Sequence, residues 1–581
     1  MKGMLAVTAA AAVGVTALPT PTSQHAIAAG VSFGFKEITA GIDETHHVAQ
    51  GYDADILIRW GDPVLPGAPA FDPINQSAAA QEQQFGYNCD FIGYLPLPHG
   101  SDNPNHGLLF VNHEHTNEEL MFPGVGRQDR KGFASMTREL VDVEMAVHGA
   151  TVIEAEKIGG KWKINGDSQY NRRISARSTE KRFSGPAAGV ERMKTSADPS
   201  GARVIGMISN CAGGQTPWGT FLTAEENFNG YFWNRGAVRG HKEERNLKRY
   251  GVPGEWYNWG QHYDRFDIGK EPNEPNRFGW IVEVDPYDPT STPIKRTALG
   301  RFKHEGAETL INKDGRVVCY MGDDQRFDYV YKFVSHGPYD PNNRDANRNL
   351  LDSGSLFAAR FDSDGSLTWL PLVYGAGSLN EKNGMAGQAD VLIETRRAAD
   401  LVGATPMDRP EDVQPNPVTD RVYVMLTNNT KRKDGDTNAT NPRGPNPYGP
   451  IVEMTPPGSD HGALKYTWDF LIQCGDPREP SAGSNWWPAT SDNGWFQAPD
   501  NAAVDGLGRL WVATEGNRPG SHSDRSDGVW AVETAGPMRG TSRHFFRTPI
   551  GAELCGPRFT PDDQNLFVSV QHPGDGGVIG T

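Results

Sequence analysis

Short runs of apolar residues recur along the chain, each preceded by a turn containing Gly, Asp or Asn. Six of them stand out, at residues 107–112, 218–223, 315–321, 421–426, 508–513 and 565–570. Further apolar stretches such as residues 280–284 and 451–454 read as partner strands. Short apolar runs bounded by turn residues are typical of β-strands. The chain is therefore predicted to be all-β.

A repeated unit of turn, strand and polar strand end is typical of the blades of a β-propeller, whose inner strands carry functional side chains toward a central channel. Six runs predict about six blades. Residues 231–278 and 431–450, rich in Asn, Gly, Arg and Pro, are predicted to be long insertions in loops. We predict a single propeller domain over residues 30–581, with two smaller β-domains as the alternative.

The composition agrees with this fold and narrows the chemistry. The 581 residues include 67 Gly and 42 Pro, which suits short strands joined by turns better than long helices. The net charge of −16 argues against a nucleic-acid partner and is compatible with cation binding, or with solubility alone. Five well-separated cysteines form no CxxC pair, which excludes a zinc ribbon.

The first 29 residues are predicted to be a signal peptide. One Lys precedes an Ala-rich apolar stretch that ends in a plausible cleavage site near Ala29. The stretch is too weakly apolar for a durable membrane anchor. It looks like the remainder of a Tat signal whose twin-arginine start is missing, so we expect an exported protein, periplasmic or extracellular.

Polar residues gather at the ends of the predicted strands. Carboxylates that converge on a channel mouth repel one another unless cations neutralise them, and hard oxygen ligands select calcium. Cys89 beside Asp90 adds a soft ligand that indicates a transition metal. The alternative is that the acidic strand ends are solvated turns and Cys89 is a buried small residue.

Several catalytic motifs are absent from the sequence. There is no HExxH, no Walker A loop and no GxSxG elbow, which argues against a zinc protease, a P-loop nucleotide hydrolase and a serine hydrolase.

Six segments together resemble the PhoX alkaline phosphatases. They are Phe85–Asp90, Val111–Glu114, Cys211–Thr220 with Glu225–Asn227, Gly300–Glu305, Arg409–Glu411 and Pro499–Asn501. The similarity spans roughly residues 50 to 575 in the same order, and the Cys211–Thr220 stretch is its most specific part. The resemblance implies a monomeric, exported propeller that hydrolyses phosphomonoesters with a cluster of Fe3+ and Ca2+.

The resemblance also implies roles for individual residues. Cys89 resembles the thiolate ligand of iron, and Glu305 with either Glu225 or Glu226, preferably Glu226, resembles the cluster carboxylates. Further ligands are expected at Asp90, Asn112, Glu114, Asp323, Asp408 and Glu553. Lys303 stands where an Arg that contacts phosphate is expected, and Arg301 or Arg409 would compensate. Cys211 belongs to the family signature, but its Gly-rich surroundings predict a packed thiol.

The implied reaction is metal-assisted hydrolysis, in which metals bind the phosphate oxygens and a bridging oxygen or hydroxide supplies the nucleophile. Two other functions stay open at this point. One is a non-catalytic, calcium-stabilised propeller that binds a partner. The other is a lactonase-like calcium propeller hydrolase, which needs one calcium and no thiolate, so iron content discriminates between them.

Overall fold

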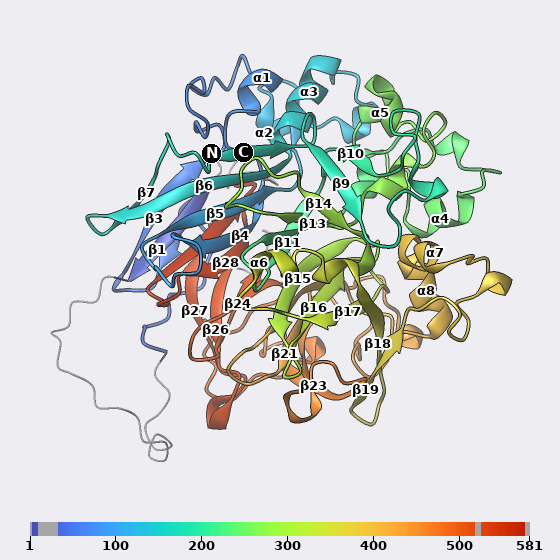
Figure 1. Ribbon diagram of the computed structural model, residues 1–581. Helices are drawn as coiled ribbons and strands as arrows, with labels where there is room; N and C mark the ends of the chain where they lie inside the picture. Colours follow the sequence, from blue (N-terminus) through green and yellow to red (C-terminus); the bar gives the residue numbers. More distant parts are fainter. Residues whose placement is uncertain (1–2, 10–32, 517–524, 576–581) are drawn as a thin grey trace.

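A computed structural model describes residues 3–9, 33–516 and 525–575 of the chain. Strands dominate this part, and hydrogen bonds join them into five sheets (Figure 1). The largest sheet contains two blades joined edge to edge by pairing of β19 (Ser366–Pro371) with β23 (Lys465–Gln473). The five sheets are therefore six blades, which confirms the predicted architecture.

Six short strands, one from each blade, form the innermost layer. They are β4 (Cys89–Pro96), β11 (Asn210–Gln215), β15 (His304–Ile311), β20 (Pro410–Pro415), β24 (Pro499–Val504) and β28 (Glu553–Phe559). Each packs against the next in this order, and β28 packs against β4. These contacts close a ring around a central channel.

The six apolar runs of the sequence are the second strand of each blade rather than the first. These strands are β5 (His106–His113), β12 (Phe221–Glu225), β16 (Arg316–Asp323), β21 (Val422–Leu426), β25 (Leu510–Thr514) and β29 (Asn565–Gln571). Each pairs antiparallel with the inner strand of its own blade. They are strongly apolar because neighbouring blades bury both of their faces, whereas the inner strands line a polar channel.

The remaining strands complete the blades outward. They are β2 (His47–Val48), β3 (Tyr52–Arg59), β6 (Gly149–Ile158), β7 (Lys161–Ile164), β8 (Arg172–Ser175), β9 (Glu180–Ser184), β10 (Arg203–Ile205), β13 (Ile281–Val284), β14 (Ile294–Arg296), β17 (Val330–Pro338), β18 (Gly354–Phe361), β22 (Pro450–Thr455), β26 (Gly528–Val532) and β27 (Ser542–Arg547). β1 (Gly3–Ala9) pairs with β29 and β3. It lies in the predicted signal peptide, whose residues 1–2 and 10–29 fall outside the described part, so the signal peptide stays a prediction.

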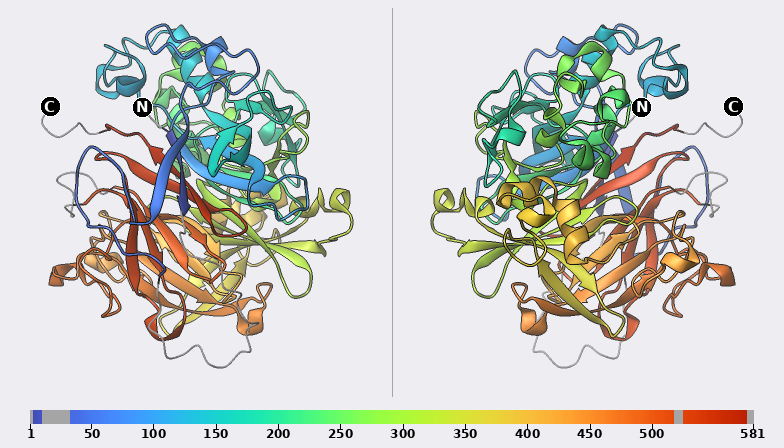
Figure 2. Two further views of the ribbon diagram at one scale, coloured as in Figure 1. Left: turned by 90° about the vertical axis from the view of Figure 1, so that its left-hand side faces the viewer. Right: turned by 90° about the vertical axis from the view of Figure 1, so that its right-hand side faces the viewer.

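Helical insertions leave the blades at one end of the channel. They contain α1 (Ala78–Gln81), α2 (Glu118–Met121), α3 (Arg138–Val147), α4 (Glu244–Arg249), α5 (Trp259–His262), α7 (Gln388–Ile393) and α8 (Thr395–Val402), with α6 (Arg344–Asn347) elsewhere. Figures 1 and 2 show α1 to α5 gathered on one side of the blades. The predicted insertions at 231–278 and 431–450 lie between β12 and β13 and between β21 and β22.

Apolar side chains fill the spaces between blades and beneath the insertions, where Trp259 and Trp280 are fully buried. In the described part of the chain, no helix has the length and apolar character needed to cross a membrane.

Candidate metal centre

Each inner strand brings a side chain of a metal-binding type to the same end of the channel. In five blades it is the second residue of the strand, namely Asp90, Cys211, Glu305, Glu411 and Asp500. In the sixth blade it is Glu553, the first residue of β28. The first five side chains are at most 5% exposed. A ring of six blades therefore presents a ring of ligand-type groups.

These side chains meet in four overlapping groups, and within each group the candidate ligand atoms all lie within 4.8 Å of one another. The groups are Asp90, Asp500, Glu553 and Cys555; Asp90, Glu114 and Cys211; Cys211, Glu226 and Glu305; and Glu305, Glu411 and Asp500. We call these nine residues the channel cluster. Because the groups share members, the cluster is continuous and offers donor sets for more than one cation.

The backbone bends each inner strand where it meets the cluster. Every one of the six strands shows a register shift beside its ligand-type residue, for example between Cys89 and Ile92 in β4 and between Asn210 and Gly213 in β11. Such bulges redirect side chains and are frequent beside active sites. The residue just before the strand has a positive φ in four blades, at Asn88, Ser209, Arg409 and Ala498. Strained backbone of this kind concentrates at functional sites.

The second strands bring further carboxylates to this end of the channel, and two of them, Glu114 and Glu226, belong to the channel cluster. Glu114, Glu226, Asp324 and Glu515 each follow directly after the last residue of β5, β12, β16 and β25. Antiparallel pairing places the end of a second strand beside the start of an inner strand. Two consecutive strands of one blade therefore both deliver acidic groups to the same channel end.

The channel cluster is strongly acidic and poorly compensated. Burial raises the pKa of Glu305 well above its ordinary value, and the nearby Asp90 and Glu226 raise it further. Burial likewise raises the pKa of Asp500, with Glu553 and Asp90 adding to the effect. Buried negative charges repel one another strongly because the protein interior screens them poorly. Such a set of carboxylates therefore needs cations to stay ionised.

Four buried oxygen atoms of the cluster lack a hydrogen-bond donor. Within the described residues these are Asp90 Oδ1, Glu226 Oε1, Glu411 Oε1 and Asp500 Oδ2, of which only Glu411 Oε1 forms an ion pair, with Arg409. Buried polar atoms in native proteins nearly always have a hydrogen-bond partner, and where they lack one a bound ion can take its place. The donor set of carboxylates plus the Cys211 sulfur fits hard cations together with a thiophilic metal.

Two cationic side chains stand at the rim of the cluster. The Arg409 guanidinium donates to Asp324, with Nε to Oδ1 at 2.8 Å, and also pairs with Glu411 and Glu515. Lys303 Nζ donates to Asn227 Oδ1 at 2.8 Å and to Gln325 Oε1 at 2.9 Å. Burial lowers the pKa of Lys303 to about 8, although the charge of Glu226 opposes this.

Lys303 and Arg409 line a cavity of about 590 Å³ beside the cluster. Other lining residues come from the insertion between β12 and β13 and from the segment after β16. The cavity gives small molecules a route to the cationic rim of the channel cluster.

Three predicted ligands face away from the cluster. Glu225 accepts from Lys295 Nζ at 2.7 Å, and Asp323 accepts from Arg396 Nε at 2.8 Å. Cys89 lies in an apolar cluster, with its sulfur 3.5 Å from His113 Nδ1. Glu225 and Cys89 are each one residue away from a cluster member, and successive side chains of a strand point to opposite faces. These three side chains thus contact residues outside the channel cluster, and their assignment as ligands stays a prediction.

Three further candidates hold the framework. Arg301 donates to the backbone carbonyl oxygens of Pro275, Phe278 and Ile393 and is fully buried. Asp408 pairs with Arg432 at 2.6 Å. Asn112 Oδ1 accepts from the backbone N–H of Phe91 at 2.7 Å, so it fixes the bulge of β4. Asp408 belongs to none of the ligand-type groups in the described part of the chain.

The sequence interpretation missed Cys211, Glu411, Asp500 and Cys555. Cys211 was predicted to be a packed thiol, yet its sulfur lies 3.2 Å from Glu226 Oε2, inside the cluster. Burial, with help from Glu114 and Glu305, raises the pKa of this thiol. Glu411 and Asp500 lie in the segments that carry the family resemblance, and the signal that identifies them is their common place as second residue of an inner strand.

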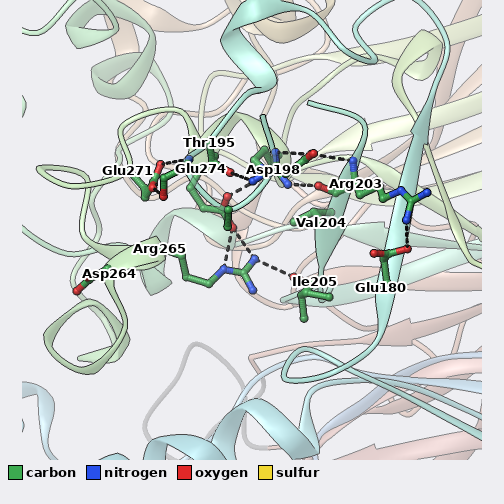
Figure 3. Close-up of a pocket in the computed structure, with 13 residues that line it drawn as sticks. Glu180, Thr195, Asp198, Arg203, Val204, Ile205, Asp264, Arg265, Glu271 and Glu274 are labelled. Atoms are coloured by element: carbon green, nitrogen blue, oxygen red, sulfur yellow. Dashed lines mark hydrogen bonds and ion pairs between the residues drawn. The ribbon is translucent and has the colours of Figure 1, made fainter. Parts of the chain in front are cut away.

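A separate hollow of about 380 Å³ lies at β10 and the insertion over residues 264–277 (Figure 3). Its charged groups are mostly paired with one another: Arg265 with Glu274, Arg203 with Glu180, and Arg277 with Asp198. It contains no member of the channel cluster.

The six-bladed ring and its acidic, thiol-containing channel define a propeller with the donor set of a metal centre. A family model described as alkaline phosphatase PhoX matches residues 33–574. The chain belongs to the PhoX alkaline phosphatase family, which confirms the resemblance.

Among solved structures, PhoX from Pseudomonas fluorescens in complex with vanadate, a transition state analogue, is 41% identical, with a TM-score of 0.87; the match covers 94% of this chain and 95% of that one. A gluconolactonase from Xanthomonas campestris, XC5397, is 10% identical over 68% of this chain and 89% of its own, with a TM-score of 0.24. A comparison with curated protein sequences finds no match.

Proposed function

We propose that this protein is a metal-dependent alkaline phosphatase that hydrolyses phosphomonoesters and releases inorganic phosphate. The observation that carries the proposal is the continuous channel cluster, whose buried carboxylate oxygens lack hydrogen-bond donors, together with the cationic Lys303 and Arg409 in the adjoining cavity. The vanadate complex of the 41% identical relative supports a phosphoryl-transfer site in this fold.

We propose Ca2+ and Fe3+ as the metals. Carboxylate oxygens from several blades suit Ca2+. A thiolate is a soft donor that calcium does not favour, so we assign it to Fe3+. We propose the thiolate of Cys211 rather than that of Cys89, because Cys211 lies among the cluster carboxylates. When bound, these ions would polarise the phosphate and supply an activated oxygen nucleophile. Cys211, Glu226 and Glu305 would hold one ion, and Asp90, Asp500 and Glu553 another.

The protein's own cations would act on the phosphate. Lys303 would donate hydrogen bonds to a phosphate oxygen in place of its present amide partners, and these bonds strengthen as negative charge builds up on the equatorial oxygens. Asp324, Glu411 and Glu515 fix the orientation of the Arg409 guanidinium, which would present its fork to a second oxygen. Both residues thus orient the monoester and stabilise its transition state.

The test is to measure phosphate release from 4-nitrophenyl phosphate together with the metal content of the purified protein. We expect calcium and iron to be present, and Cys211→Ala to lose iron and activity while Cys89→Ala keeps both. Retention of iron in Cys211→Ala would contradict the ligand assignment. Activity that survives complete metal removal would contradict the proposed mechanism.

A non-catalytic calcium-stabilised propeller and a lactonase-like hydrolase are the alternatives, and absence of iron and of phosphatase activity would favour them. We further propose that the protein is an exported monomer with a Tat-type signal peptide at residues 1–29. Fractionation of cells that express the full-length gene, followed by size measurement of the mature protein, tests this part independently.

A further inference from the structure

The cavity beside the channel cluster is much larger than a phosphate group requires. Its volume of about 590 Å³ falls within the range of ~300–1,000 Å³ found for pockets that enclose whole small molecules. Only Lys303 and Arg409 of its lining belong to the proposed phosphate site. The rest of the wall is therefore available to the leaving group of the substrate.

One part of this wall is an indole ring. Trp256 belongs to the insertion between β12 and β13 and is 48% exposed, although it is a large apolar side chain. The ring packs closely on Gly230, where an added Cβ would come within 2.6 Å of it. Lys303 Nζ lies 5.5 Å from the ring centroid. The indole is thus fixed in position beside the phosphate site while much of its surface stays open.

Another part of the wall is the guanidinium group of Arg326, which has no acidic partner among the residues that the structure describes. Arg326 follows β16, and its Nε is buried without a hydrogen-bond partner; in the described ranges it forms no ion pair. The other arginines of the wall are neutralised, since Arg249 pairs with Asp328 and Arg396 with Asp323. The neighbouring Gln325 is bonded to Lys303 Nζ at 2.9 Å. Lys303 therefore contacts the segment that carries Arg326 and also lies beside Trp256.

We propose that this cavity is a leaving-group subsite for phosphomonoesters whose leaving group contains a flat ring and carries a second negative charge. The inference rests on the proposed phosphatase function. Trp256 stacks on the ring, because indole faces favour offset stacking with flat π-systems. Arg326 pairs with the second charge, which relieves an otherwise unpaired buried donor.

The test compares kcat/KM for three substrates: 4-carboxyphenyl phosphate, phenyl phosphate and glycerol 2-phosphate. Trp256→Ala is expected to lower the ratio of phenyl to glycerol phosphate about 3- to 10-fold, the size of an aromatic stacking contact. Arg326→Gln is expected to lower the ratio of carboxyphenyl to phenyl phosphate about tenfold, the size of one charged hydrogen bond. Differences in leaving-group reactivity cancel, because each ratio is compared between variant and parent.

Matched controls come from exposed residues elsewhere. Trp487, 44% exposed, and Arg127, whose side chain is 66% exposed, do not line this cavity, so Trp487→Ala and Arg127→Gln should leave both ratios unchanged. Trp256→Phe should restore most of the selectivity for the ring. Unchanged ratios in Trp256→Ala and Arg326→Gln, with an active parent, overturn the subsite alone. A parent that hydrolyses none of the three substrates overturns the phosphatase proposal and the subsite with it.

Discussion

Two sets of buried carboxylates lie side by side in this protein and differ in their partners. Glu226, Glu305 and Asp500 of the channel cluster face other acidic groups, whereas the paired carboxylates Glu225, Asp323 and Asp408 each contact Lys or Arg. All six are at most 4% exposed. Burial therefore does not distinguish a metal-binding acid from a structural one; the charge that faces it does.

Metal removal should separate the two sets most strongly. A chelator of calcium and iron should abolish phosphatase activity and lower the Tm, because uncompensated repulsion returns and the stabilisation by bound ligand disappears. Restored activity on adding the metals back is the control against irreversible unfolding. An unchanged Tm and rate after verified metal loss would show that the channel cluster does not depend on cations.

The chelated protein should also become less stable as the pH rises. The pKa values of Glu226, Glu305 and Asp500 are raised in the fold by burial and by neighbouring acids. A folded-state pKa above the unfolded one gives stability that is present in acid and is lost as the pH rises through the folded pKa. Thermal unfolding of the chelated protein between pH 5 and 8 checks the sign, and a Tm that increases over this range contradicts it.

Removing one charge from each set should have opposite consequences. Glu305→Gln should lower kcat/KM by two or more orders of magnitude through lost metal, with little or no destabilisation of the metal-free protein, because it removes repulsion. Glu225→Gln should instead cost about 3–5 kcal/mol of unfolding free energy, because Lys295 is left buried without its partner. Metal analysis and urea unfolding of both variants measure the difference; equal metal loss in the two would erase the distinction.

At the rim of the cluster the expected effect is smaller. Lys303→Ala should lower kcat/KM on the order of 10- to 100-fold, since a charged hydrogen bond contributes roughly 1.5–3 kcal/mol. Lys303→Arg should keep the activity. The matched control is Arg301→Lys, two residues away, whose parent side chain bonds only backbone carbonyls; it should change stability rather than kcat/KM. An unchanged kcat/KM in Lys303→Ala removes this residue from the site.

The sequence predicts the blade count because each second strand is apolar along its whole length. It also identifies the correct channel end, since acidic residues follow these strands. It does not identify which of two adjacent residues faces the channel, as in Cys89 and Asp90. A bulge near the start of each inner strand shifts the alternation of side chains between the two faces of the strand. A shift of one residue exchanges the side chains that face the channel with those that face away from it.

The helices within the insertions were also not predicted from the sequence. The elements α2, α3, α7 and α8 are short, and tertiary packing rather than local periodicity stabilises helices of this length. The place of Cys211 beside the other ligand-type groups could not be predicted for a related reason. Its Gly-rich neighbours suggested simple packing, but Gly213 and Gly214 let β11 approach the neighbouring strands closely: a Cβ on Gly214 would lie 2.1 Å from the backbone of Ala307.

The ligand-type residues occupy equivalent positions in the inner strands, so their side chains could be exchanged between blades without changing the backbone. Asp90 and Cys211 occupy the same position in adjacent inner strands, which pack against each other. Exchanging the two side chains would move the thiol to the neighbouring blade. The backbone bulges that orient the two side chains would stay in place. In each blade the backbone therefore fixes the direction of the ligand-type side chain, while the residue type at that position decides which metal it favours.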